Sequence, residues 1–460
     1  MLATAIGVSL ATFYYSRSVE EESFESEFVS VAGVTLRSFV EAIESKLSAM
    51  DSVSSSITSH ALSSGETFPN VTLPDWEVKG ATLRVQTDGI YLFWLPLVTD
   101  ENRRGFEEYT KLKQGQLFQS YVAEEGYRAQ QDTYFGLGGE DGDADEGENR
   151  QLHIAGPDEH PVMHDEIWGN AAVVSNNLTM HMGFSLTCQL LYLQCHFFSS
   201  TTQTADEPAS EGSGPFLPCW QLSPIIPLPS ILNFNFFSFL DLAPMFHEVL
   251  ETGKAVLGYL QTTHIGSDTE DLIRILLTLG QYRHSQVAYD ADPMTQVAYP
   301  VFDNFGSDRQ VTGIILTTIF WRLLFEDVLP ANVRGVICVL HNTLGEDVTY
   351  RIDGQTATLL GPGDLHDPEY DSMVVTRDIT EYVTERASPE SWSYTLVELD
   401  TGYTSYMLSV YPSDAMEDQY VTSDPMIYSV VVVLVFVFTT LVFMLYGKTF
   451  IPAGFESGQG

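Results

Sequence analysis

Cysteine is scarce in this chain, with four residues among 460. A chain of this length can bury a sizeable hydrophobic core, so it does not need a disulfide framework for stability. The spacing of the cysteines fixes no pairing and matches no zinc-site pattern. The four are Cys188, Cys195, Cys219 and Cys338.

Basic residues are few as well. The 21 lysines and arginines stand against 62 aspartates and glutamates, which gives a formal net charge of -41. A surface this negative repels the phosphate backbone, so a nucleic-acid partner is excluded. The anionic inner leaflet of a membrane would repel it too, which favours a domain on the outer side.

Catalytic motifs are missing. The sequence has no Walker loop, no G-x-S-x-G elbow and no HExxH helix, so we predict no catalytic residue, no metal site and no cofactor. The acidic loop 136–150 resembles a calcium loop, but Glu146 and Leu152 stand where such a loop has glycine and glutamate. A further polar segment lacks the helical spacing of metal ligands; it contains His153, Asp158, His160, His164 and Asp165.

A long uncharged run near the C-terminus is the strongest signal in the sequence. Residues 426–446 carry no charge, and a helix rising about 1.5 Å per residue covers the hydrocarbon core of a bilayer with such a length. We predict a transmembrane helix there. Residues 1–15 are apolar but short, and we interpret them as an N-terminal anchor. A truncated first helix and a cleaved signal peptide remain alternatives.

The flanks of these segments predict the orientation. Lys448 follows the second segment directly, and basic residues near a span end stay on the cytoplasmic side. We therefore expect residues 16–425 outside the plasma membrane and residues 447–460 as a short cytoplasmic tail. Two sequons in the outer part are candidate glycosylation acceptors, at Asn70 and Asn177.

Apolar residues recur at spacings of three and four from Val19 to Leu62, which predicts one long helix. We describe residues 16–62 as a stalk helix. It either packs on the domain as an ordinary amphipathic helix or also carries motion to the membrane, and a homodimer could form along it. Its apolar positions are Phe24, Phe28, Val31, Leu36, Phe39, Ile43, Leu47, Met50, Val53 and Ile57.

Beyond the stalk, β-branched and aromatic runs between turns predict strands, and the fold class is α+β. A short helix is expected over residues 323–329, and another helix over 100–113 with Asp100 as its N-cap. The predicted strands cover residues 83–85, 90–95, 297–302, 311–320, 336–341, 350–352, 394–398 and 406–411.

Several motifs in this region resemble a CHASE domain, the extracellular sensor module of receptor histidine kinases and nucleotide cyclases. One is the block Gly214–Gln221, and another is Tyr299–Phe302 followed by Gly313–Ile315. The run Gly363–Pro368 is similar to putative receptor guanylate or adenylate cyclases of diatom-like algae. The sharpest match is a W-x-P-x-V run with an arginine and an aromatic-Glu pair, formed by Trp94, Pro96, Val98, Arg103, Phe106 and Glu107.

The resemblance implies a PAS-like mixed α/β sensor that binds an unknown small extracellular ligand. Trp220 and Trp321 could equally be core aromatics. The family's cyclase is not found in this chain, and residues 174–204 interrupt the expected pattern, which indicates an insertion. The candidate ligand contacts are Trp220, Gln221, Asn235, Tyr299 and Trp321.

The leading functional prediction is thus the sensor part of a transmembrane signalling receptor. A stand-alone membrane-anchored binding or adhesion protein is the alternative, although no repeat period supports it. An ectoenzyme is the third hypothesis. His366 lies between Asp364 and Asp367, but Gly363 and Pro368 around it predict a tight turn before a cation site.

Overall fold

The computed structural model describes residues 2–89, 91–113, 117, 214–223, 232–239, 241–260, 292–386, 399–400 and 402–450. The acidic loop 136–150, the segment 174–204, the sequon at Asn177 and the strand expected over 394–398 lie outside these residues. The described part is mixed α and β, with a long N-terminal helix and two five-stranded antiparallel sheets.

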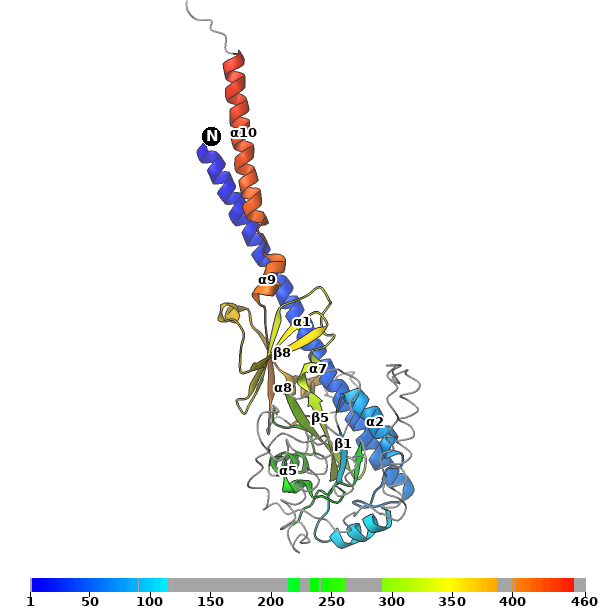
Figure 1. Cartoon of the computed structure of the whole chain (residues 1–460). Coiled ribbons are helices and arrows are strands. Elements are labelled where there is room, and N and C mark those ends of the chain that lie inside the picture. Colours follow the sequence, from blue (N-terminus) through cyan, green and yellow to red (C-terminus); the bar gives the residue numbers. More distant parts are fainter. Residues whose placement is uncertain are drawn as a thin grey trace, which may run out of the picture.

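A single helix, α1 (Leu2–Ser64), runs along both sheets. Figure 1 shows it passing from the N-terminus, beside α10, to the far end of the molecule. At about 1.5 Å per residue, its 63 residues extend over roughly 95 Å. The predicted stalk helix is therefore confirmed, and it begins earlier than expected. All of its predicted apolar positions from Phe24 to Ile57 are buried.

The sheet farther from α10 is called the distal sheet here. Its strand order is β2-β1-β5-β4-β3. Side chains alternate between its faces. Trp94 and Ile315 pack toward α1, whereas Phe93 and Ile314 pack toward α5 (Ala243–Thr252). The strands are β1 (Leu92–Pro96), β2 (Gln221–Ser223), β3 (Val256–Leu257), β4 (Met294–Phe302) and β5 (Val311–Phe320).

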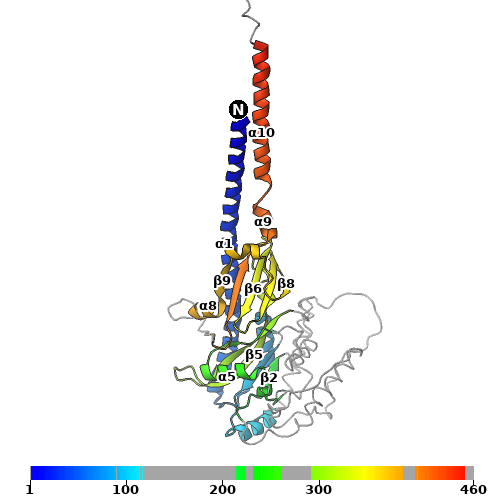
Figure 2. The same ribbon diagram turned by 90° about the vertical axis from the view of Figure 1, so that its left-hand side faces the viewer.

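The proximal sheet lies between the distal sheet and α10 (Figure 2). Its order is β8-β7-β6-β10-β9, and α7 (Trp321–Leu324) leads into it from the distal sheet. After β10 the chain continues through α9 (Asp414–Tyr420) into α10 (Asp424–Phe450). The remaining elements are β6 (Val336–Asn342), β7 (Asp347–Asp353), β8 (Thr356–Pro362), η4 (Pro368–Met373), β9 (Val375–Asp378), α8 (Ile379–Arg386) and β10 (Tyr406–Tyr411).

Most strand predictions are confirmed, but the one over 83–85 is wrong. These residues belong to the helix α2 (Trp76–Thr87). Trp76, Gly80, Leu83 and Thr87 are buried at helical spacing, a pattern that a three-residue run does not reveal. Gly80 permits this packing, because a Cβ atom there would lie 2.5 Å from the Cβ of Ser223.

The helix expected from Asp100 begins later, at residue 103. Asp100 is not its cap: its carboxylate accepts a hydrogen bond from the Gly214 amide at 3.2 Å, and this contact connects two distant parts of the chain. The helix expected over 323–329 is mostly wrong: α7 is a single turn that starts two residues earlier and ends at Leu324, and residues 325–329 are not helical. A local pattern cannot place these boundaries, because tertiary partners set them.

The two apolar ends of the chain lie side by side, as both views show (Figures 1 and 2). The hydroxyl of Ser9 donates to the carbonyl of Ser429 at 3.0 Å. Among the described residues, one helical segment, Asp414–Tyr446, is long and apolar enough to cross a membrane. The predicted transmembrane stretch 426–446 lies within it, while residues 2–15 form the first turns of α1.

Candidate functional site

The five predicted ligand contacts are all buried, and they do not line one common cavity. Trp220, Gln221 and Tyr299 belong to the face of the distal sheet toward α1. Asn235 lies in the segment on the opposite face, and Trp321 lies at the passage to the proximal sheet. Their exposed fractions range from 0% for Trp220 to 6% for Asn235. Each has polar partners within the protein.

Trp220 and Gln221 fasten the loop after α1 to the edge of the sheet. The indole of Trp220 donates to the Thr72 hydroxyl at 3.0 Å. The amide of Gln221 accepts from the Leu73 N–H and donates to the Leu73 carbonyl, both at 2.9 Å. This pairing satisfies both backbone groups of a buried residue. The two bonds give Gln221 a structural role and use one N–H and one acceptor position of its amide.

Replacing Gln221 by leucine should therefore destabilise the fold. The change keeps the side-chain size but leaves the two backbone groups of Leu73 without partners. At about 1–3 kcal/mol for each, we expect the free energy of unfolding to fall by about 2–6 kcal/mol in denaturant titration. The exposed Gln310→Leu is the control and should change it by less than about 0.5 kcal/mol. Equal stability of both variants would contradict the structural role.

Asn235 has a local role. Its side-chain oxygen accepts from the Leu217 N–H at 3.0 Å and from the Phe237 N–H at 3.3 Å. It thereby caps the short helix η2 (Phe236–Ser238) and holds the neighbouring strand edge. Asparagine is favoured at such caps because its oxygen reaches backbone amides that the helix leaves unpaired. The residue shapes the segment that covers this face of the sheet.

Tyr299 and Trp321 connect elements that are distant in the sequence. The phenol of Tyr299 donates to Asp51 of α1 at 2.8 Å. Burial and the negative charge of Asp51 raise the pKa of Tyr299 well above its ordinary value, so it stays protonated. The indole of Trp321 donates to the Thr295 hydroxyl at 2.8 Å, and that hydroxyl also lies 3.1 Å from the Tyr406 phenol.

The motif residues that carry the family resemblance come together in the structure. Trp94, Phe106 and Trp220 are buried in the same core. Arg103 pairs with Glu107 at 2.9 Å and lies over the ring of Phe216, 5.0 Å from its centre. Val98 forms a bridge with Phe216, and Pro96 ends β1. These contacts join the start of the helix over 103–113 to the sheet edge, which is a packing role.

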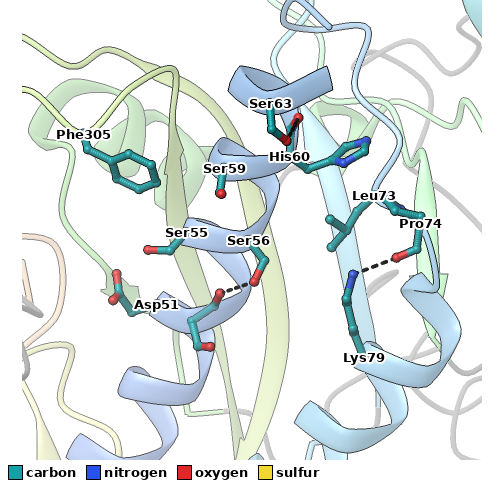
Figure 3. Close-up of a pocket in the computed structure, with 11 residues that line it drawn as sticks. Asp51, Ser55, Ser56, Ser59, His60, Ser63, Leu73, Pro74, Lys79 and Phe305 are labelled. Atoms are coloured by element: carbon teal, nitrogen blue, oxygen red, sulfur yellow. Dashed lines mark hydrogen bonds between the residues drawn. The ribbon is translucent and has the colours of Figure 1, made fainter. Parts of the chain in front are cut away.

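An open groove of about 600 Å³ follows the exposed face of α1 near its C-terminal end. In Figure 3, Phe305 flanks α1 on one side, and Pro74 and Lys79 flank it on the other. The Lys79 ammonium is held by the Pro74 carbonyl at 2.9 Å. Five of the eleven lining residues are serines of α1, and Asp51, His60 and Leu73 also contribute; the serines are Ser52, Ser55, Ser56, Ser59 and Ser63. The lining suits a polar ligand or a closely packed helix better than an apolar molecule.

Asp51 connects this groove to the interior. Its carboxylate lines the groove and also accepts the hydrogen bond from the buried Tyr299 phenol. Tyr299, one of the predicted ligand contacts, therefore does not line the groove itself but contacts Asp51, which does. The serine spacing in α1 was visible in the sequence. The groove could not be predicted from that spacing, because its other walls come from three separate segments, which contribute Phe305, Pro74 and Lys79.

A polar row on the other face of the distal sheet was missed by the sequence analysis. Gln296 of β4 pairs with Thr318 of β5. Leu92 pairs with Thr317, which places Tyr91 beside Thr318. Burial raises the pKa of Tyr91 to about 12, although the neighbouring Thr318 and Gln296 side chains oppose this shift. Three polar side chains thus cross the centre of an otherwise apolar face. Alternation within the strands predicted over 90–95 and 311–320 could have indicated Tyr91 and Thr318, whereas Gln296 lies just before the strand predicted over 297–302.

The remaining predictions concern sites for modification or metal. At the first sequon, the hydroxyl of Thr72 is buried and lies 2.5 Å from the Tyr109 phenol. Within the described ranges, no group of three or more histidine, cysteine, aspartate or glutamate side chains could hold a metal ion. The segment with His153, His160 and His164 is outside those ranges. Of the cysteines, Cys219 and Cys338 are described, and both are buried thiols.

Comparisons with known proteins give no family for the chain. No protein-family model matches it, and no curated protein is significantly similar to it. The resemblance to a CHASE domain therefore stays a prediction.

Proposed function

We propose that the chain is the ligand-sensing part of a transmembrane signalling receptor. Residues 16–425 lie outside the plasma membrane, and the sensor is similar to those of receptor nucleotide cyclases. The continuity of α1 is the observation that carries this proposal. One helix joins the apolar end of the molecule to the far end of the distal sheet, so a shift at that sheet moves the segment beside α10.

The exposure of the apolar side chains supports a membrane at this end. In α1, Leu10 is 52% exposed, whereas Phe28 and Phe39 are fully buried against the sheets. In α10, Phe438 is 69% exposed. A continuous apolar surface of this kind is unfavourable in water and marks contact with lipid or protein. We assign it to lipid, because both helices run together beyond the sheets.

Two places in the distal sheet could take the ligand. A PAS-like sensor holds its ligand against one sheet face, which favours the face with Tyr91, Thr318 and Gln296. Such sites combine an apolar lining with a few placed polar groups. The hydroxyl-lined groove on α1 is the second place, and it also suits a homodimer formed along this helix.

A pair of cysteines tests the proposal in the full chain held in lipid nanodiscs. The hydroxyls of Ser9 and Ser429 lie 2.7 Å apart, so the variant Ser9→Cys with Ser429→Cys should form a disulfide on mild oxidation. The control pairs Ser9→Cys with Thr440→Cys, about 16 Å farther along α10, and should stay reduced. A similar yield from both pairs would contradict the side-by-side helices.

The same pair then reports ligand action. Adenine-type compounds and amino acids are added in large excess, and the thermal midpoint and the rate of disulfide formation are both measured. A ligand at a hundred times its Kd stabilises by about 2.7 kcal/mol, which the midpoint detects. A sensor should show a changed disulfide rate with the stabilising compound. Stabilisation with an unchanged rate would instead favour an anchored binding protein.

A further inference from the structure

His366 lies between two carboxylates at the end of the molecule nearest α10. Its Nδ1 is 2.5 Å from Asp364, and its Nε2 is 2.6 Å from Asp371. The imidazole stacks on Tyr411 of β10, with ring centres 3.8 Å apart and planes 10° from parallel. Its side chain is 14% exposed. Both ring nitrogens thus face acceptors, and only the protonated imidazolium can donate to both.

The loop that carries His366 is fixed to the proximal sheet. The Thr349 hydroxyl of β7 donates to the Gly363 carbonyl at 2.6 Å and accepts from the Leu365 N–H at 3.0 Å. Asp371, by contrast, belongs to η4. The histidine therefore joins two separate pieces, the loop held by the sheet and the short helix η4.

The short helix η4 is in turn joined to the helix that leads to the membrane end. The Tyr370 phenol lies 3.0 Å from Asp414 and 2.8 Å from Glu417, both in α9. Glu417 also lies 3.8 Å from the guanidinium of Arg17 in α1. A chain of polar contacts thus runs from His366 through η4 and α9 to α1. We name these contacts the juxtamembrane latch.

We propose that protonated His366 closes the juxtamembrane latch and that loss of its proton opens it, so that the contact between η4 and α9 responds to pH. Neutral imidazole keeps one N–H donor, and its other nitrogen then points a lone pair at a carboxylate. One of the two contacts turns from attraction to repulsion. The response needs no ligand, and it goes beyond the proposed sensing function.

The charged surroundings determine the direction of the response. Partial burial alone would lower the pKa of His366, but the hydrogen bonds to Asp371 and Asp364 and their negative charges outweigh it and raise the pKa above 6.5. Tyr411 is the remaining titratable group against the ring, and burial keeps its phenol protonated. A raised histidine pKa means that the contacts are fully present below pH 6.5 and are lost as pH rises through the higher, folded value.

Hydrogen exchange of the full chain in nanodiscs tests the latch. Exchange is followed by mass spectrometry in the peptides around 366–374 and 412–422, from acidic to mildly alkaline pH, and corrected for intrinsic rates. We expect protection at low pH and faster exchange as pH rises, by up to about tenfold for each unit by which the pKa is raised. Corrected exchange that is constant over this range would overturn the proposal.

Two variants and a control complete the test. His366→Arg stays charged at all these pH values and should protect both peptides throughout, whereas His366→Gln should leave both exchanging fast throughout. His341→Gln is the matched control, because His341 also pairs with an aspartate in the same sheet, 2.9 Å from Asp347. It should keep the wild-type pH profile in both peptides. A pH profile that persists in His366→Gln would show that another group is responsible.

Discussion

Replacing Asp292 by alanine should lower the free energy of unfolding of the full chain by about 3–5 kcal/mol. Asp292 precedes β4 and is 6% exposed, and its carboxylate accepts from the Nε of Arg322 at 2.6 Å. Arg322 belongs to α7, where the chain passes from one sheet to the other, and it also pairs with Glu326. Without Asp292, a buried guanidinium loses one of its two carboxylates.

Denaturant titration measures this loss, and an exposed pair provides the control. Arg104 and Glu108 lie 3.4 Å apart, with side chains 91% and 70% exposed. Glu108→Ala should therefore cost less than about 1 kcal/mol. Asp292→Asn should lie between the two, since it keeps an acceptor but no charge. If Asp292→Ala and Glu108→Ala gave equal values, the buried pair would not stabilise the junction.

Replacing Trp321 by alanine should cost about 3–5 kcal/mol, as expected for a large buried side chain. Trp321 is 1% exposed and packs between Phe39 of α1 and Tyr406 of β10, with ring centres 6.1 Å and 4.7 Å away. The Tyr406 phenol also donates to the Gly258 carbonyl at 2.7 Å. The indole therefore fills the space where the helix and the two sheets meet.

Two further variants separate packing from ligand contact. Trp321→Phe keeps an aromatic ring and should lose less stability than Trp321→Ala, because only the indole hydrogen bond and part of the volume are removed. Phe305→Ala, at a ring that is 61% exposed, should change stability by less than about 0.5 kcal/mol. A stable, folded Trp321→Ala variant that had lost only ligand binding would overturn the packing role.

The periodicity of apolar residues predicted those features of the fold that depend on one helix or one strand alone. The buried face of α1 followed from its apolar spacing, and β5 and β10 begin and end where the β-branched runs do. The division into two sheets was not predicted, because it depends on strand pairing between distant segments. β1 lies between β2 and β5, for example, and hydrogen-bonds to both.

The sites were harder to predict than the elements. Tryptophan and glutamine in a motif predicted ligand contacts, which stay a prediction; in the structure Gln221 binds the backbone of Leu73 and Trp220 binds Thr72. A structural role and a ligand-binding role of the same side chain differ only in the groups that it contacts in the folded protein, and the sequence does not show these contacts. His366 shows the reverse case. The sequence indicated a tight turn, and the two carboxylates that enclose the ring come from positions two residues before it and five residues after it.

The unbroken course of α1 also limits how the chain length can vary. Each residue of a helix turns its successor by about 100°, so one inserted residue between Ser9 and Phe39 would rotate one end of α1 relative to the other. Ser9 would then face away from Ser429, or Phe39 away from Trp321. Insertions of about seven residues, close to two whole turns, would restore the angle. The helix thus sets both an angular phase and a distance between the segment beside α10 and the sheets: an insertion of seven residues keeps the phase but lengthens the helix by about 10 Å.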